Sequence, residues 1–356
     1  MTQSFPGMLD EVIEKLEKKR GQGRTLAPSQ NGAPPLCHDW SQREVDALQV
    51  ALVTRRPLLL RGEPGSGKTQ LARAVAHELG WALHSMTVHP RMEPHEVLYR
   101  FDAVERLAWA QDKERIQDLN SNRFYEPGPL WWAMDWVSAR QVELMRNGDS
   151  GHEAEPSGHV VLIDEIDKAD TDLPNSLLEV FGERELRLPC EPRKLSYRAG
   201  SGLPPLILLT TNEDRELPAP FLRRCVVLSL EVRADDPEWL LEHRAKAHFR
   251  TSEIKDANDG VSELDGARAT LSESVMRAAA VLMTRERARL RATGLTQPGV
   301  AEYLDLLHAL HGLQSQQQWG DDELLIRFRQ FAPYLYRKQG GEHVPAEMQQ
   351  WTDWTD

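Results

Sequence analysis

Residues 62–69 read Gly-Glu-Pro-Gly-Ser-Gly-Lys-Thr and are separated by one residue from the apolar run 57–60. They match Gly-x-x-x-x-Gly-Lys-[Ser/Thr], the pattern of a loop that binds phosphates between a strand and a helix. The glycines let successive N–H groups face a phosphate, and the following helix points its positive end at the same place. We therefore predict a nucleotide site formed by Gly62, Glu63, Pro64, Gly65, Ser66, Gly67, Lys68, Thr69 and Gln70.

Two side chains of this loop have separate tasks, and two carboxylates elsewhere in the chain complement them. Lys68 is expected to neutralise the β- and γ-phosphates, and the Thr69 hydroxyl to bind Mg²⁺. A second apolar run, 160–163, ends in Asp164 and Glu165. We expect Asp164 to hold the same Mg²⁺ through a water and Glu165 to polarise the attacking water. This interpretation requires that the loop and the strand end share one ligand.

Further polar residues follow a third apolar run, 206–210. Asn212 comes just after it, where its amide can hydrogen-bond the attacking water or the γ-phosphate. The segment Leu-Pro-Ala-Pro-Phe-Leu-Arg-Arg-Cys then supplies Arg223 and Arg224. An arginine that reaches a transferring phosphoryl group stabilises its charge. Both arginines are candidates, and the sequence does not distinguish between them.

Strands alternate with helices up to residue 232. Strands are expected at 57–60, 83–88, 160–163, 206–210 and 225–230, and helices at 69–79 and 130–146. A further helix through Val53 is expected to begin at Ser41, which has Glu44 three residues later in a capping-box spacing. Short, continuously apolar strands separated by helices are typical of parallel sheets that are buried on both faces. The fold class predicted is a three-layer α/β core with a mostly parallel sheet.

The pattern changes beyond Arg233, where helices are expected and no strand. The expected helices are 237–250, 272–292, 300–313 and 322–331. We predict an amphipathic helix at 8–20 and a Gly- and Pro-rich linker at the chain start. The predicted parts are 1–36, the helix and linker; 37–232, the nucleotide-binding core; 233–340, a helical lid; and 341–356, an acidic tail with two tryptophans.

Composition limits the classes of function. The chain has 356 residues, with 43 basic and 55 acidic ones, for a net charge of −12. Because binding to nucleic acid depends on cations that neutralise phosphates, this charge disfavours a nucleic-acid partner. Cys37, Cys190 and Cys225 lack CxxC spacing, which argues against a disulfide scaffold or zinc site and favours a reducing compartment. With no long apolar run and no apolar leader, we expect a cytoplasmic protein without membrane contact.

The order of GEPGSGKT, VVLIDEID, LTTN and LPAPFLRRC resembles that of an AAA+ ATPase over about residues 40–310. Phe-Tyr-Glu-Pro-Gly-Pro-Leu at 124–130 is similar to the GPL segment of the MoxR-like branch of that family. That branch carries a hairpin insertion within its second helix, which implies one here near 90–125. The resemblance also implies a core followed by an α-helical lid, with ATP and Mg²⁺ as cofactors.

The same resemblance implies a homo-oligomer, a hexameric ring, with ATP between subunits and an arginine finger donated in trans. It implies remodelling or a chaperone task on a protein client, often beside a partner with a von Willebrand factor A domain. The chain departs from the family at sensor 2, where Gln297 and Pro298 stand in place of a cation. Arg289 or Arg291 of the preceding helix are the alternatives for that role.

Three functions remain open on the sequence. The first is an ATPase that remodels a protein. The second is a nucleotide-dependent switch or scaffold with weak hydrolysis, which the missing sensor-2 cation favours. The third is the ATPase motor of a nucleic-acid-targeting defence complex, which the acidic net charge disfavours.

Overall fold

A computed structural model describes residues 5–20, 24–27, 36–111, 122–148, 154–183, 185–187, 194–196, 203–251, 269–317 and 319–336. The chain divides into two compact units, Met1–Glu231 and Val232–Asp356. Each unit is described by itself.

A five-stranded parallel sheet forms the centre of the first unit, in the order β11-β3-β10-β7-β4. Its strands are β3 (Leu58–Arg61), β4 (Ala82–Thr87), β7 (His159–Asp164), β10 (Leu206–Thr211) and β11 (Val226–Ser229). Because all five strands run the same way, their carboxyl ends meet at one edge of the sheet. The predicted site residues after β3, β7 and β10 therefore gather at that edge.

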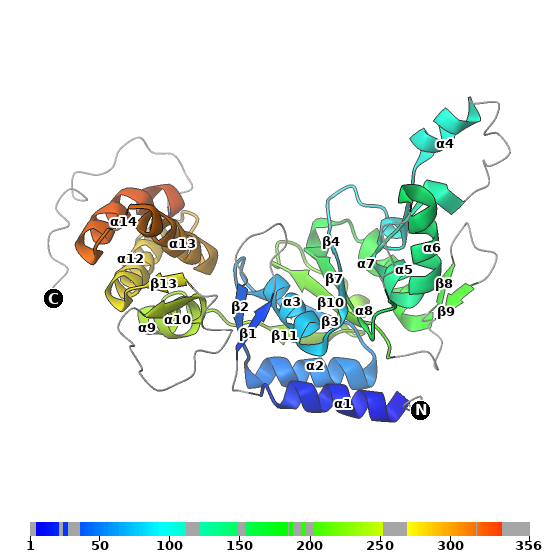
Figure 1. Ribbon diagram of the computed structural model, residues 1–356, viewed down its shortest axis with the longest axis horizontal. Helices are drawn as coiled ribbons and strands as arrows, with labels where there is room; N and C mark the ends of the chain where they lie inside the picture. The colour runs from blue at the N-terminus through cyan, green and yellow to red at the C-terminus, as the bar shows by residue number, and fades with distance from the viewer. Residues whose placement is uncertain are drawn as a thin grey trace. The chain divides into compact units, whose positions relative to one another are not determined.

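Helices cover both faces of this sheet (Figure 1). Leu58 and Leu60 pack on one face and Leu59 on the other, as the alternation of a strand dictates. The first face carries α1 (Phe5–Glu17), α2 (Gln42–Thr54) and α3 (Lys68–Leu79). The second carries α5 (Pro129–Met134), α6 (Trp136–Asn147), α7 (Asp172–Glu183) and α8 (Ala219–Leu222). The predicted fold class, a three-layer α/β core, is confirmed.

The start of the chain belongs to this unit. Val12 and Leu16 of α1 are buried in the core beside α2 and α3. The expected linker at 21–36 contains a strand, so that prediction is wrong for part of the segment: β1 (Arg24–Ala27) pairs antiparallel with β2 (Leu36–Asp39). A four-residue strand is too short to show periodicity, and β1 is separated from its partner β2 by a segment rich in Gly and Pro. The sequence therefore does not indicate this strand. The capping box at Ser41 and Glu44 is confirmed.

A small antiparallel ladder occupies the region expected to hold an insertion. β5 (Tyr99–Phe101) pairs with β6 (Tyr125–Pro127), and between them lie α4 (Ala103–Ala110) and the turn η4 (Asn122–Phe124). The turn η2 (Pro94–Val97) precedes the ladder. No residue of α4 is buried, and Figure 1 shows this helix projecting from the unit. The ladder lies within the predicted range 90–125, apart from the last residues of β6.

The single helix expected at 130–146 is two helices, α5 and α6. Asp135 interrupts them with an extended backbone, φ −147° and ψ 78°, and its side chain accepts a hydrogen bond from the Ser138 N–H at 3.0 Å. An aspartate that caps a new helix in this way competes with continuation of the old one. Further along the chain, β8 (Glu185–Arg187) and β9 (Lys194–Ser196) form another antiparallel pair.

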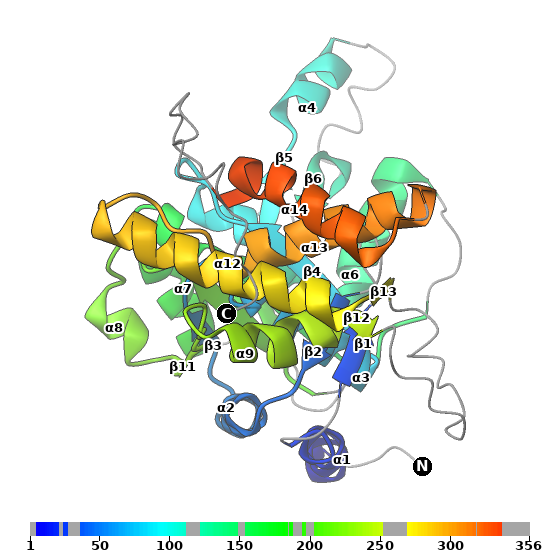
Figure 2. The same cartoon turned by 90° about the vertical axis from the view of Figure 1, so that its left-hand side faces the viewer.

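The second unit is mainly helical. Its long helices are α12 (Glu273–Ala292), α13 (Val300–Gln317) and α14 (Asp321–Tyr336), which pack against one another (Figure 2). Shorter segments precede them: α9 (Pro237–Leu240), the π-helical turn η6 (Leu241–Ala245) and α10 (Lys246–His248). Tyr303 is fully buried at the centre of this unit and donates a hydrogen bond to the Met276 carbonyl at 3.0 Å.

Two short strands correct the expectation of an all-helical second unit. β12 (Phe249–Thr251) pairs in parallel with β13 (Ala269–Leu271), so the helix expected to reach residue 250 ends at His248. Strands of three residues show no periodicity that a sequence could reveal. The polar sequence at 251–266 also predicts a loop, but Thr251 is the last residue of β12; residues 252–266 and the tail 341–356 lie outside the described residues. Among the described helices, none has the length and apolar character needed to cross a bilayer.

Candidate nucleotide site

The phosphate loop lies between β3 and α3, and three of its glycines have positive φ. The values are 148° at Gly62, 77° at Gly65 and 99° at Gly67. A Cβ at Gly62 would lie 2.8 Å from the Leu230 carbonyl oxygen and 3.0 Å from Ser66 Oγ. The loop therefore passes too close to the end of β11 for any side chain, and its conformation requires glycine.

Lys68 begins α3 and is almost fully buried under this loop. Its ammonium donates hydrogen bonds to the carbonyl oxygens of Gly62 at 2.6 Å and Glu63 at 3.0 Å. Burial lowers the pKa of Lys68, and the negative charges of Asp164 and Asp167 act in the opposite sense. The loop thus surrounds a cation, as a site for a polyphosphate requires.

The loop and the end of β7 are in direct contact. Thr69 Oγ1 donates a hydrogen bond to Asp164 Oδ2 at 3.0 Å. Hydroxyl and carboxylate oxygens are the ligands that Mg²⁺ prefers, and this ion commonly uses one or two carboxylates together with phosphates and water. The donor set therefore fits Mg²⁺, although the described residues hold no cluster of three or more metal-ligating acids, histidines or cysteines.

Thr210 of β10 fixes both residues at the end of β7. Its hydroxyl donates a hydrogen bond to Asp164 Oδ1 and accepts one from the Glu165 N–H at 2.8 Å. The parallel register, which aligns Leu209 with Ile163, brings Thr210 beside Asp164. Thr210 is completely buried, and its hydroxyl positions both Asp164, a predicted metal ligand, and Glu165, a predicted catalytic residue.

Glu165 has a left-handed backbone, with φ 60° and ψ 49°. Its Oε1 accepts a hydrogen bond from Asn212 Nδ2 at 3.1 Å, and its Oε2 forms an ion pair with Lys168 Nζ at 2.6 Å. Nearby, the buried Asp167 accepts a hydrogen bond from the Asp214 N–H at 2.9 Å and so ties this turn to the loop after β10. The structure thus brings Asp164, Glu165 and Asn212 together beside Thr69.

The remaining predicted site residues lie on the loop, on α3 and after α8. Gln70 is half-buried in the first turn of α3, whereas Glu63, Pro64 and Gly65 are exposed on the loop. Arg223 and Arg224 follow α8, and both side chains are exposed.

Three residues with contacts in this region, Thr210, Asp167 and Lys168, were not predicted from the sequence. The sequence could have indicated Thr210, because a threonine at the buried end of an apolar strand needs a hydrogen-bond partner for its hydroxyl. It gives no comparable indication for Lys168, since a lysine at the end of a turn is common. Its contact with Glu165 depends on the left-handed backbone of that residue, which a non-glycine residue rarely adopts.

The arginines considered for sensor 2 are bound within the second unit. Arg291 donates to Asp235 Oδ2 at 2.5 Å and to Gln297 Oε1 at 3.2 Å. Arg289 lies 3.9 Å from Glu286. The role of each in nucleotide sensing stays a prediction.

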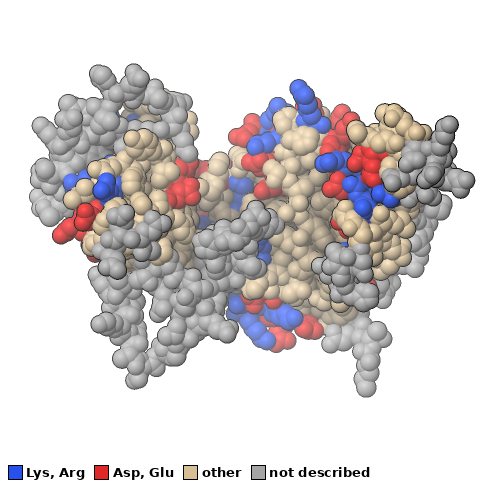
Figure 3. All heavy atoms as spheres, turned by 45° about the horizontal axis from the view of Figure 1, so that its top comes forward, with Lys and Arg blue, Asp and Glu red and all other residues tan. Residues whose placement is uncertain are grey.

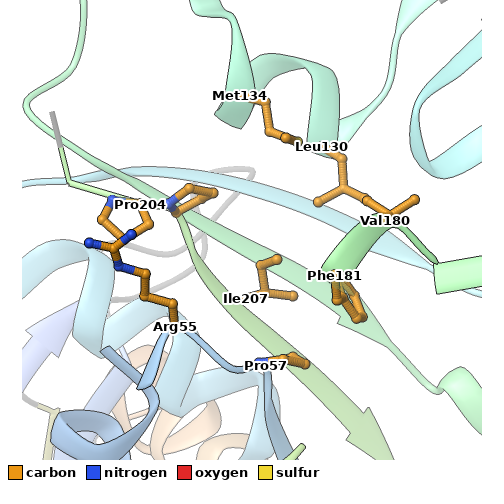
Figure 4. Close-up of a pocket in the computed structure, with 9 residues that line it drawn as sticks. Arg55, Pro57, Leu130, Met134, Val180, Phe181, Pro204 and Ile207 are labelled. Atoms are coloured by element: carbon orange, nitrogen blue, oxygen red, sulfur yellow. The ribbon is translucent and has the colours of Figure 1, made fainter. Parts of the chain in front are cut away.

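An apolar pocket, drawn in Figure 4, lies beside the residues at the amino ends of β3 and β10. Its volume is about 510 Å³, including the part open to solvent. Pro57, which precedes β3, and Ile207, near the start of β10, line it together with Leu130 and Phe181. Because Pro57 and Ile207 lie at the amino ends of parallel strands, this pocket is separate from the candidate site at the carboxyl ends.

Comparisons with known proteins agree with this geometry. Residues 57–225 match the family model of the AAA domain (dynein-related subfamily). The matched segment includes the phosphate loop, both strand-end carboxylates, Asn212 and both candidate arginines, so this part of the chain is similar to an AAA domain. No curated protein matches the chain.

Solved structures that are similar to the chain share little sequence with it. A "putative ATPase" from Cytophaga hutchinsonii ATCC 33406 is 16% identical, with a TM-score of 0.39, over 92% of this chain and 86% of that one. A point mutant of RuvB from Thermotoga maritima is 15% identical, with a TM-score of 0.34, over 76% and 68%. NtrX from Brucella abortus is 14% identical, with a TM-score of 0.36, over 67% and 45%.

Proposed function

We propose that this chain is a Mg²⁺-dependent ATPase that uses ATP hydrolysis to remodel a protein partner. The observation that carries the proposal is the contact between Thr69 and Asp164 at 3.0 Å, which joins the phosphate loop to the strand end. The hydrogen bond between Asn212 and Glu165 adds a positioned base beside it. Phosphoryl transfer to water needs these two elements, a held triphosphate and an oriented nucleophile.

Each residue has a task that follows from its chemistry. Lys68 and the amides of the loop bind the β- and γ-phosphates, and Thr69 with Asp164 holds Mg²⁺. When bound, the metal ion neutralises charge on the phosphate oxygens. Glu165 orients the attacking water and accepts its proton, while Asn212 holds the Glu165 carboxylate in place.

Two substitutions test this division of tasks. Lys68→Ala should abolish binding of a fluorescent ATP analogue, because the buried cation is lost. Glu165→Gln should bind the analogue normally yet hydrolyse ATP at least about 100-fold more slowly, since an amide is not a base. Lys18→Ala is a control, because Lys18 lies just after α1, its side chain is 69% exposed and its ammonium pairs with Glu14 of that helix. Retained affinity in Lys68→Ala would contradict the assignment of the loop.

We also infer that the active form is a ring of the MoxR-like type, with Arg223 or Arg224 donated to the ATP of a neighbouring subunit. Both side chains are exposed, which supports a role outside their own chain. Arg223→Ala and Arg224→Ala should each be mixed with Lys68→Ala chains. Recovery of ATP turnover in one of the two mixtures identifies the finger, and failure of both mixtures contradicts the trans model.

The client is proposed to be a protein, such as one with a von Willebrand factor A domain. The net charge of −12 argues against a nucleic-acid track. On the face drawn in Figure 3, acidic and basic side chains of the described residues are interspersed. Salt-sensitive binding to DNA or RNA, with stimulated ATP turnover, would favour a motor on nucleic acid instead.

One observation favours a second function, a nucleotide-dependent switch with weak hydrolysis. Lys168 lies 2.6 Å from the proposed base Glu165 and competes with water for it. A single-turnover measurement on the assembled protein separates the two functions. Rapid release of phosphate supports the remodelling ATPase, whereas stable retention of ATP supports the switch.

A further inference from the structure

The backbone of Glu165 is held in one conformation by its neighbours. Its left-handed φ of 60° is costly for a residue with a Cβ and persists only where surrounding contacts enforce it. Here the Glu165 N–H donates to Thr210 Oγ1 at 2.8 Å, and the Lys168 N–H donates to the Glu165 carbonyl at 3.0 Å. The direction in which the carboxylate leaves the strand is therefore fixed.

Both oxygens of this carboxylate have partners. Oε1 accepts from the Asn212 amide at 3.1 Å, and Oε2 lies 2.6 Å from the Lys168 ammonium. A base that activates water must accept a hydrogen bond from that water. The ammonium takes one of the two acceptor positions on Oε2, and its positive charge makes the carboxylate a weaker base toward a water bound at the other position.

We propose that Lys168 is a positioning residue that restrains Glu165, so that hydrolysis proceeds only when the ammonium releases Oε2. The proposal rests on the proposed function as an ATPase. Lys168 can move without unpacking the core, because its side chain is 42% exposed whereas that of Glu165 is 26% exposed. The charges of Asp214 and Asp167 also attract the ammonium and keep it at this edge after release.

Lys168 carries its positive charge at neutral pH. The hydrogen bond with Glu165 raises the pKa of Lys168, so the lysine keeps its proton under ordinary conditions. A protonated, paired amine reacts slowly with acylating reagents, which need the free base. The reactivity of Lys168 therefore reports its contact with Glu165 without any requirement for ATP hydrolysis.

The first test is acetylation of the full-length protein by an amine-reactive ester, followed residue by residue with mass spectrometry. Lys168 should react several-fold faster in Glu165→Gln than in the wild type, because the carboxylate charge is gone. Lys18 serves as the internal reference, and its rate should not change. Equal rates at Lys168 in the two proteins would overturn the proposal.

The second test is single-turnover hydrolysis at saturating ATP. Lys168→Met, which keeps the length and apolar character of the side chain, should raise the rate by roughly tenfold, since one charge-assisted hydrogen bond to the base no longer has to break. Lys168→Arg should stay near the wild type because it retains the charge, and Lys18→Met is the matched control. An unchanged or lower rate in Lys168→Met would overturn the restraint.

The two kinds of failure are distinguishable. If Glu165→Gln hydrolyses ATP as fast as the wild type, the proposed function is wrong, whatever happens at Lys168. If Glu165→Gln is slow but Lys168→Met is not faster than the wild type, the ATPase stands and the role of Lys168 is refuted.

Discussion

Thr210→Val offers a sharp test of the site, because one buried hydroxyl holds two of the proposed catalytic residues. Valine has nearly the shape of threonine and leaves no cavity. The substitution removes the donor to Asp164 Oδ1 and the acceptor of the Glu165 N–H. Asp164 and Glu165 are half-buried, so water can partly replace the lost partner. Each lost hydrogen bond then costs about 0.5–1.5 kcal/mol, and we expect a loss of roughly 1–3 kcal/mol of unfolding free energy.

ATP turnover in Thr210→Val should fall by more than the loss of unfolding free energy alone would cause. Without the hydroxyl, the Asp164 side chain and the Glu165 backbone lose a shared anchor. A displacement of about 1 Å at a catalytic group can cost on the order of 100-fold in rate. Urea unfolding measures the first effect, and ATP turnover under folded conditions measures the second. Binding of an ATP analogue should weaken less than turnover, because Lys68 and the loop amides are unchanged.

Thr210→Ser separates the hydroxyl from the methyl group. It keeps both hydrogen bonds and removes one buried methyl, which costs about 1 kcal/mol, and its turnover should stay within a few-fold of the wild type. If Thr210→Val and Thr210→Ser show the same turnover, the hydroxyl does not position Asp164 and Glu165, and the reasoning fails.

Two further predictions concern the loop and the sheet. Gly62→Ala should lose ATP affinity, because its Cβ would lie 2.8 Å from the Leu230 carbonyl oxygen, whereas Gly80→Ala, also at positive φ but with open space around it, should cost only about 1–2 kcal/mol of stability and keep affinity. His84 and His159 pair at 3.0 Å, and burial lowers the pKa of each ring to about 4 from an ordinary 6.5. Because the unfolded chain binds more protons in that window, stability should fall as pH drops from about 7 to 5, on the order of 3 kcal/mol for the pair. Urea midpoints at the two pH values measure this fall, and it should shrink in His159→Gln; a flat profile would count against buried neutral rings.

Much of this fold could be predicted from the sequence, because the patterns that indicate it involve residues close together in the chain. The phosphate loop, the apolar strands and the capping box at Ser41 each depend on residues that are near neighbours in the chain. The carboxyl-edge rule for parallel strands then predicted that the residues after β3, β7 and β10 meet. The left-handed turn at Glu165 was not predictable in this way, because it depends on contacts that form only after β7 and β10 align.

Elements that depend on distant partners were missed. β1 and β12 are too short to show a pattern, and each exists because a second segment pairs with it. Asp135 could have been recognised as a helix cap, since Ser138 follows at the capping distance, but the apolar and aromatic residues on both sides read as one helix. Local sequence patterns therefore predicted where the candidate site lies. The contacts between its side chains depend on strand register and turn geometry, which those patterns do not contain.

The central claim is that one metal-bound triphosphate is shared by the loop at 62–69 and the strand end at 164–165. The most direct measurement is a crystal structure with Mn²⁺ and a non-hydrolysable ATP analogue, in which anomalous scattering locates the metal. We predict that the metal lies between Thr69 Oγ1 and Asp164, with the β- and γ-phosphates against Lys68 and the loop amides. A triphosphate bound elsewhere, or a metal bound away from Thr69 and Asp164, would contradict it.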